Sequence, residues 1–239
     1  MPGVVRVLTA ADVPGQRLVG LVVRDWPVFV AAGETTRCVG DVLALVVADS
    51  QPRARRAAAA VAVAYEVLEP ITSPEQALAP GAPALHPSGN VLEVCAFARG
   101  DVDAALALSA HVVSARYRTQ RIEHAFLEPE ACLAVPVPHP PVERPASRVL
   151  RRERIPEGRE ASERSTLEAE PGGWGITVFT QGQGVHADQA QIAAVLGVAK
   201  ERGLVELVSN GGAFGGKEAL LVQGQTALAA HLLGRPVRT

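Results

Sequence analysis

The first part of the chain shows apolar runs that predict strands around one short helix. Val4–Leu8 is mostly apolar, and Asp41–Ser50 is a continuous apolar run between polar residues, which indicates a buried strand. Ser50 is a favourable N-cap and Pro52 is tolerated in a first helical turn, so a helix is predicted next. Apolar and polar positions then alternate over residues 61–68, which predicts another strand and completes a strand–helix–strand unit.

The middle of the chain predicts three further strands and a short helix. Asp101 is a favourable N-cap for a helix through Leu106, and alternation over His111–Thr119 predicts a strand. Ala131–Val137 and Gly175–Thr180 are also predicted to be strands. These segments are expected to begin a second domain.

The C-terminal stretch predicts two helices with a strand between them. A helix is expected directly after the turn Gln181–Gly184, ending at Gly197 because glycine readily adopts the left-handed C-cap conformation. A strand is expected over Gly203–Ser209, followed by the loop Asn210–Glu218. The final helix is expected to present Leu221, Leu228 and Leu232 on its apolar face. It is expected to stop at Gly234 and Pro236.

Two stretches lack such periodicity. Residues 78–90 are rich in proline and glycine, which predicts extended chain, and we place an interdomain linker at residues 81–98. Residues 138–172 combine prolines with nearly balanced Arg and Glu and few large apolar side chains, so we predict a disordered surface insertion. The predicted domains are therefore residues 1–80 and 99–239.

Composition supports a folded core and argues against two classes of partner. Of the 239 residues, 48% are hydrophobic, and the formal net charge is −2. Without a basic field to bind a phosphate backbone, nucleic acid is not expected as a partner. The most apolar run, residues 57–65, is well short of the roughly 20 residues that span a bilayer, so no membrane partner is expected either.

The three cysteines point to a reducing compartment. Cys38, Cys95 and Cys132 are too far apart in sequence for a zinc knuckle or an iron–sulfur cluster, and each is interpreted as a small buried side chain. An odd cysteine count without an export signal predicts a cytoplasmic protein.

The loop Asn210–Glu218, with the sequence NGGAFGGKE, is the strongest candidate for chemistry. Its glycines allow a ligand to approach the backbone closely, and a strand-to-helix turn directs free N–H groups toward an anion. The turn Gln181–Gly184, with the sequence QGQG, occupies an equivalent junction. We therefore expect the two loops to converge on one pocket at one edge of a sheet.

The same loop partly fits the phosphate-binding pattern of P-loop nucleotide hydrolases. Gly211, Gly216 and Lys217 have the required spacing. The next position should be Ser or Thr to bind magnesium, but it is Glu218, whose charge would repel phosphate oxygens. A nucleotide binder is thus the weakest alternative, and Lys217 is interpreted as a solvated charge or ion-pair partner in a first helical turn.

Longer stretches resemble the molybdenum-binding large subunit of the xanthine dehydrogenase/aldehyde oxidase family. In the second half they are RGDVDAAL, RTQRIEHAFLEPEACLAVP, VFTQGQGVHADQAQIAAVLGV and NGGAFGGKEALLVQGQTALAAHLLGRPV; in the first half they include PGVVRVLTAADVPG and RCVGDVLALVVADS. The sequences of these motifs most resemble the selenium-dependent xanthine dehydrogenase branch. The resemblance implies a mixed α/β (α+β) fold: an N-terminally clipped α/β hammerhead domain, then the first part of a molybdopterin-binding α/β domain. Only the N-terminal portion of such a subunit is expected here.

The resemblance also implies roles for residues of both loops. Gln183 would hydrogen-bond an oxygen ligand of molybdenum, with Gln181 as second choice because it lies two residues out of register. Glu218 and Phe214 would face the substrate, and a carboxylate favours purines because it accepts hydrogen bonds from their N–H edge. The backbone beside the pterin and the metal's ligands would be Gly212, Ala213, Phe214 and Gly215.

The implied reaction is hydroxylation of a purine, such as xanthine or hypoxanthine, with water. The implied cofactor is molybdopterin or its cytosine dinucleotide form, and electrons would pass to iron–sulfur clusters and FAD on partner chains or modules. The family's general-base glutamate lies downstream, so no catalytic residue is expected in this chain, and the remaining C-terminal part of the subunit is an expected partner. The alternatives are an aldehyde-oxidising relative and a catalytically incomplete scaffold fragment.

One acidic cluster allows a second kind of site. His124, Glu128 and Glu130 could be drawn as metal ligands. The resembling family has a structural strand edge here, so hydrogen-bonded structural roles are the favoured interpretation.

Overall fold

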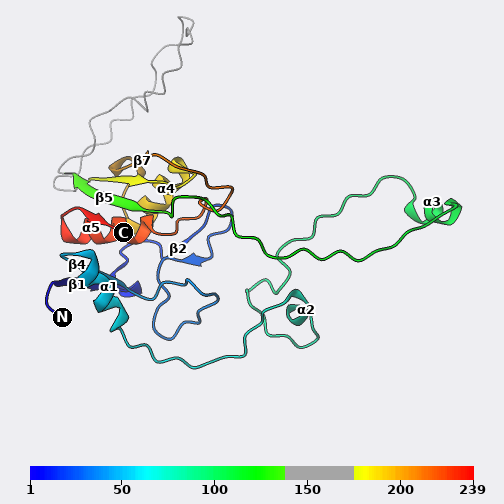
Figure 1. The fold of residues 1–239 in the computed structure, drawn as a ribbon, viewed down its shortest axis with the longest axis horizontal. Helices are drawn as coiled ribbons and strands as arrows, with labels where there is room; N and C mark the ends of the chain where they lie inside the picture. Colours follow the sequence, from blue (N-terminus) through cyan, green and yellow to red (C-terminus); the bar gives the residue numbers. More distant parts are fainter. Residues whose placement is uncertain (138–174) are drawn as a thin grey trace, which may run out of the picture. The chain divides into compact units, whose positions relative to one another are not determined.

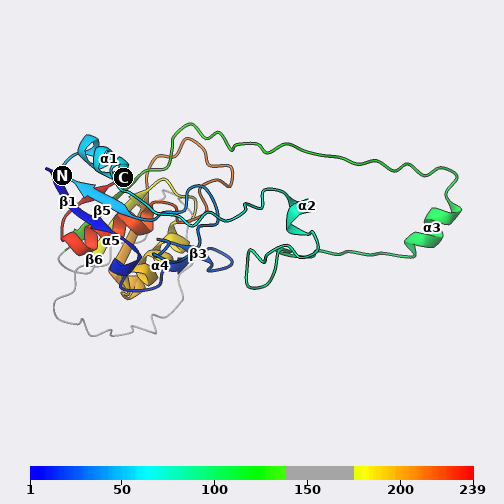
Figure 2. The same cartoon turned by 90° about the horizontal axis from the view of Figure 1, so that it is seen from below.

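The computed structural model describes residues 1–137 and 175–239, which form two compact units. The larger unit contains residues 1–61 and the described residues from 124 onward, and the smaller unit contains residues 62–123 (Figures 1 and 2). The predicted insertion at 138–172 lies outside the described residues. The domain boundaries expected at residues 80 and 99 stay predictions.

The N-terminal part of the larger unit is built on two paired strands and a helix. β1 (Val4–Leu8) pairs antiparallel with β4 (Leu45–Ala48), and α1 (Gln51–Ala59) packs against both strands. Ser50 precedes α1 in an extended conformation, and Pro52 lies in its first turn. The two strands and the helix are confirmed, although β4 is shorter than the predicted run and only half-buried.

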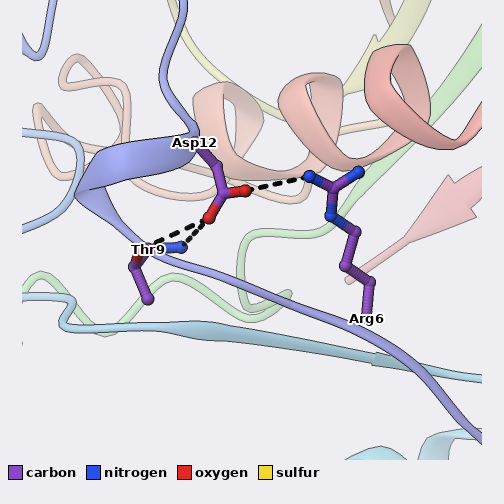
Figure 3. A network of polar contacts seen from close by, with 3 residues as sticks. All are labelled: Arg6, Thr9 and Asp12. Atoms are coloured by element: carbon purple, nitrogen blue, oxygen red, sulfur yellow. Dashed lines mark hydrogen bonds and ion pairs between the residues drawn. The ribbon is translucent and has the colours of Figure 1, made fainter.

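A polar network closes the turn after β1. The 3-10 helix η1 (Ala10–Asp12) follows this strand, and the Asp12 carboxylate accepts hydrogen bonds from the Thr9 backbone nitrogen and the Arg6 guanidinium, each at 2.9 Å (Figure 3). The Thr9 backbone hydrogen bond is the main cause that holds the pKa of Asp12 below its usual value. Burial opposes it, and the hydrogen bond and charge of Arg6 lower the pKa further. The next elements are the antiparallel pair β2 (Leu18–Val19) and β3 (Trp26–Pro27).

A four-stranded sheet with the order β7-β6-β5-β8 forms the other part of this unit. β5 pairs antiparallel with β6 and β8, whereas β6 and β7 are parallel and joined through a crossover helix. The bounds are β5 (Cys132–Val137), β6 (Gly175–Thr180), α4 (Val185–Leu196), η2 (Lys200–Arg202), β7 (Gly203–Leu207) and β8 (Val237–Arg238). The strands predicted in these places are confirmed.

Two helices cover one face of the sheet. α4 contacts β7 and α5 (Gln223–Leu233), while α5 contacts β5 and β6. Gly197 and Gly234 end the two helices in the left-handed conformation, as predicted. The start of the last helix differs from the prediction, because the preceding residues form turns that bury Lys217 and Leu220. The glycine-rich loop is therefore not followed directly by a helix.

The core lies between the sheet, α4, α5 and the N-terminal segment. Backbone nitrogens of Gly15 and Gln16 donate to carbonyl groups near the end of α4, and Gln225 of α5 donates to the Val28 carbonyl at 2.9 Å. The large apolar side chains buried here include Leu8, Val28, Phe29, Ile176, Val178, Ile192, Val195 and Leu228. The N-terminal segment thus supports the helices that follow the two candidate loops.

The smaller unit contains α2 (Pro74–Ala77) and α3 (Val102–Leu108). Asp101 caps α3 by accepting a hydrogen bond from the Ala104 backbone at 2.9 Å, which confirms that prediction. The strands predicted at residues 61–68 and 111–119 are wrong: both segments lack strand structure. A strand needs a partner edge, and within the described residues neither segment is paired, so Val67 and Tyr117 are 88% and 89% exposed.

The cysteines differ in their surroundings. Cys132 is buried in β5, as predicted, whereas Cys38 and Cys95 are exposed, contrary to the prediction. Those two cysteines lie in irregular segments, where no packed element covers the side chain. Within the described ranges, none of the helices has the length and apolarity needed to cross a membrane.

Candidate functional site

The turn Gln181–Gly184 and the loop Asn210–Glu218 lie side by side. The Gln183 backbone nitrogen donates to the Lys217 carbonyl at 2.9 Å, and the Asn210 amide donates to the Gln181 carbonyl at 2.7 Å. They meet because they follow β6 and β7, parallel neighbours whose carboxyl ends share one edge of the sheet. The predicted adjacency of the two loops at one edge of the sheet is confirmed, whereas a pocket shared by them stays a prediction. A groove of about 530 Å³ lies elsewhere in the larger unit, lined by residues of β1, β4 and α1, by Leu233 and by residues 235–239.

The tip of the glycine-rich loop is open. Phe214 is 72% exposed and has a φ of 51°, and Gly215 has a φ of 85°. A Cβ atom on Gly215 would meet no other atom within 4 Å, so this position has room for a ligand beside the backbone. The Gly216 nitrogen donates to the Ala213 carbonyl at 2.7 Å, which closes the turn around the tip.

Two other glycines of this loop are needed for packing. A Cβ atom on Gly211 would lie 1.7 Å from Glu128 Oε2. A Cβ atom on Gly216 would lie 2.8 Å from Phe126 Cε1 and 2.9 Å from His124 Cγ. The four glycines were expected to serve a ligand together, but these two allow the segment 124–128 to pass directly against the loop.

Lys217 is buried, which corrects the prediction of a solvated charge. It is 1% exposed, its Nζ donates to the Glu128 carbonyl at 2.8 Å, and it lies 4.5 Å from the centre of the Phe126 ring. A carbonyl oxygen and an aromatic face replace part of the hydration that the ammonium loses. Lys217 therefore lies in a loop, where the Glu128 carbonyl and the Phe126 ring hold its side chain, and not in a first helical turn.

A buried polar network lies beneath the two loops, and sequence analysis missed it. Gln223 of α5 donates to Thr180 Oγ1 at 3.0 Å and to the Glu130 carboxylate, while the Gly182 backbone nitrogen donates to the same Thr180 oxygen at 3.1 Å. Asp188 of α4 lies beside it and is 1% exposed. The sequence contained one signal for this network: Asp188 and Gln223 are polar residues at helix positions that packing buries.

The carboxyl groups of this network titrate abnormally. Burial, and then the charge of Glu130, raise the pKa of Asp188 to about 7. Burial also raises the pKa of Glu130, against the opposing effects of the Gln223 hydrogen bond and the Lys217 charge. Within residues 1–137 and 175–239, no group of three or more His, Cys, Asp or Glu is placed to hold a metal ion. Glu128 and Glu130 instead make the structural contacts described above.

The predicted site residues occupy different environments. Gln183 is exposed, and its Oε1 accepts a hydrogen bond from the Lys217 backbone nitrogen at 3.1 Å. Gln181 donates from Nε2 to the Ser209 carbonyl at 3.1 Å, and its buried Oε1 has no hydrogen-bond partner among the described residues. Glu218 is exposed beside Lys217. The roles assigned to these residues stay predictions.

Comparisons with known proteins match nearly all of the chain. Residues 1–69 match the family described as "Aldehyde oxidase and xanthine dehydrogenase, a/b hammerhead domain", and residues 85–140 and 163–239 match "Molybdopterin cofactor-binding domain". A "Probable xanthine dehydrogenase" subunit of Bacillus subtilis (strain 168) is 33% identical over 100% of this chain and 27% of its own length. The "Nicotinate dehydrogenase large molybdopterin subunit" of Eubacterium barkeri is 29% identical over 99% of this chain and 47% of its own length.

Solved structures show the same fold. The aldehyde oxidoreductase from Desulfovibrio gigas superimposes with a TM-score of 0.75 and 26% sequence identity, covering 100% of this chain and 24% of that protein. The chain therefore spans between about a quarter and a half of these relatives.

Proposed function

This chain belongs to the aldehyde oxidase and xanthine dehydrogenase family, and from that premise we propose that it forms part of a molybdenum-binding subunit that hydroxylates a purine with water. The observation that carries the proposal is the pairing of Gln183 with Lys217, which brings the turn Gln181–Gly184 against the glycine-rich loop. One surface then combines an exposed side-chain amide with backbone that is open to a ligand.

The residues present fit a pterin-bound metal group. The space beside Gly215 and the exposed ring of Phe214 leave the loop tip accessible to a large, flat ligand. Gln183 presents an amide that can donate to an oxygen acceptor. The Oε1 atom of Gln181 is buried nearby and has no hydrogen-bond partner among the described residues. The backbone stretch that would hold the pterin comprises Gly212, Ala213, Phe214 and Gly215.

The cofactor, molybdopterin or its cytosine dinucleotide form, supplies the oxygen-transfer and two-electron chemistry when bound. The residues of this chain would bind the cofactor and orient the substrate. Gln183 would donate to an oxygen ligand of the metal, and Phe214 would provide an apolar face for a planar substrate. The general base is proposed to lie in the remaining C-terminal part of the subunit, with iron–sulfur and FAD partners accepting electrons in the cytoplasm.

Glu218 favours a purine over an aldehyde. Its exposed carboxylate accepts hydrogen bonds, which a purine N–H edge can donate and a simple aldehyde cannot. The structural likeness to an aldehyde oxidoreductase supports aldehyde oxidation as the second candidate. A scaffold that keeps the fold without the cofactor is the third.

Metal analysis of the native complex tests the proposal. The complex is captured through this chain from its source cells, and molybdenum and pterin are measured per copy. A molybdenum content near one atom per copy, together with turnover of xanthine or hypoxanthine, is expected. Turnover of aldehydes alone would favour the second candidate, and a molybdenum content near zero with partners present would favour the scaffold.

A further inference from the structure

The side chain and the backbone of Lys217 are held by different parts of the larger unit. The side chain is anchored from below by the Glu128 carbonyl and the Phe126 ring. The backbone pairs twice with Gln183: the Lys217 nitrogen donates to Gln183 Oε1 at 3.1 Å, and the Lys217 carbonyl accepts from the Gln183 nitrogen at 2.9 Å. Lys217 thus connects the segment 126–128 to the Gln181–Gly184 turn.

This pairing fixes which end of the Gln183 amide remains available. A backbone N–H can donate only to the carbonyl oxygen of a side-chain amide, so the hydrogen bond from Lys217 determines the orientation of the amide group. The Nε2 group, with two N–H donors, is left to bind an acceptor on a ligand. A free exposed glutamine would instead sample both amide orientations and several rotamers.

Burying a lysine costs free energy because its ammonium group loses hydration, unless other contacts replace that hydration. Lys217 is 1% exposed, although a lysine of an ordinary surface loop keeps its ammonium in water. The ammonium sits over the Phe126 ring and donates to a backbone carbonyl, a combination that restrains both the position and the direction of the side chain. Movement of Lys217 would move its backbone, and with it both hydrogen bonds to Gln183.

We propose that Lys217 is a positioning residue: its buried side chain fixes the loop backbone that orients Gln183, so that the amide nitrogen of Gln183 faces the bound cofactor as a hydrogen-bond donor. The orienting part depends on this chain alone, and the cofactor part rests on the proposed function. Lys217 would affect cofactor binding only by positioning Gln183, because Lys217 itself touches neither cofactor nor substrate.

Amide hydrogen exchange of the full 239-residue chain tests the orienting part. The reporters are the backbone amides of Gln183 and Lys217, which form the two hydrogen bonds, and the references are amides of Ile192 and Val195 in α4. In Lys217→Met, which keeps the length of the side chain but removes the ammonium, both reporters should exchange about tenfold faster while the references stay unchanged. Lys217→Arg keeps the charge, the donor and the aromatic contact, and should restore exchange to within about threefold of the parent.

Phe126→Leu provides a second variant if Lys217→Met does not fold. Removing the aromatic face should accelerate exchange at Gln183 about threefold to tenfold, with unchanged references. Unchanged exchange at Gln183 in a folded Lys217→Met or Phe126→Leu chain would overturn the orienting role.

Molybdenum retention tests the cofactor part separately. In a native complex that holds molybdenum, Lys217→Met should lose the metal about tenfold faster during dialysis, and Lys217→Arg should retain it like the parent. Equal retention in Lys217→Met would overturn the cofactor part. A parent complex without molybdenum would refute the proposed function, and with it the cofactor part, whereas the exchange experiment still decides whether Lys217 orients Gln183.

Discussion

Gly182 lies directly over the carboxyl group of Asp188, since a Cβ atom on Gly182 would lie 2.7 Å from Asp188 Oδ2. The same added atom would lie 3.1 Å from Gln223 Nε2. The turn that carries Gln183 therefore rests on buried polar groups of α4 and α5.

Asp188→Asn should make the stability of the protein less dependent on pH. The folded pKa of Asp188 is about 7 and its ordinary value is 3.8, so the folded state keeps a proton that the unfolded state releases. This contribution is fully present below about pH 4 and is lost as the pH rises to about 7. Asparagine cannot ionise, so the variant should exceed the parent by roughly 1–4 kcal/mol in urea unfolding at pH 8, with a much smaller difference near pH 4.

Asp12→Asn is the matched comparison because the pKa of Asp12 is lowered. Its carboxylate contributes stability above its unfolded pKa, and this contribution is lost as the pH falls through the folded pKa. This variant should be less stable than the parent at neutral pH, and the difference should shrink in acid. Parallel pH profiles for the parent and Asp188→Asn would contradict the assigned ionisation.

Gln223 and Glu130 should show strong energetic coupling. Gln223→Leu leaves the Glu130 carboxyl group without its amide donor in a buried position, which should cost about 2–3 kcal/mol of unfolding free energy. Combined with Glu130→Leu in a double-mutant cycle, the coupling should be about 1–3 kcal/mol by urea denaturation. A coupling below about 0.5 kcal/mol would mean that the two groups do not interact in solution.

Gly216→Ala should destabilise the protein through crowding alone. The added methyl group would collide with the Phe126 and His124 rings, so we expect a loss of about 1–3 kcal/mol, measured by thermal or urea unfolding. Gly203→Ala is the control, because its nearest neighbour lies 3.7 Å away and its φ is −109°. Equal stability of Gly216→Ala and the control would show that the segment 124–128 does not pack on the loop.

Glu218→Ala should change substrate preference if the proposed function holds. Loss of the acceptor for a purine N–H should lower kcat/KM for xanthine about a hundredfold, while kcat/KM for an aldehyde changes less than about threefold. Glu206→Ala, an exposed carboxylate on β7, serves as the control and should alter neither value. Equal losses for purine and aldehyde would place Glu218 outside purine recognition.

Local signals predicted much of the larger unit. The strands at Val4–Leu8, Cys132–Val137 and Gly175–Thr180 follow from apolar runs, and the helix ends at Gly197 and Gly234 follow from the conformational freedom of glycine. The strands expected at residues 61–68 and 111–119 failed because alternation describes one strand and says nothing of the edge that must pair with it.

The candidate site was predictable only in outline. Two glycine-rich turns, each following a predicted strand, were enough to predict that Gln183 lies near the loop. The burial of Lys217 depends on Phe126 and Glu128, about ninety residues earlier, and on a helix that begins later than its apolar pattern suggested. Such long-range contacts leave no periodic trace in the sequence.

The unpaired segments of residues 62–123 affect how the isolated chain will behave in a test tube. Val67, Phe97, Val113 and Tyr117, which lie outside the helices of this unit, are each at least 88% exposed. Extended backbone with open hydrogen-bonding groups and apolar side chains is a template for intermolecular β-aggregation, and a net charge of −2 gives little electrostatic repulsion between molecules. Dilution, charged additives or co-expression with binding partners should therefore increase the yield of monodisperse protein.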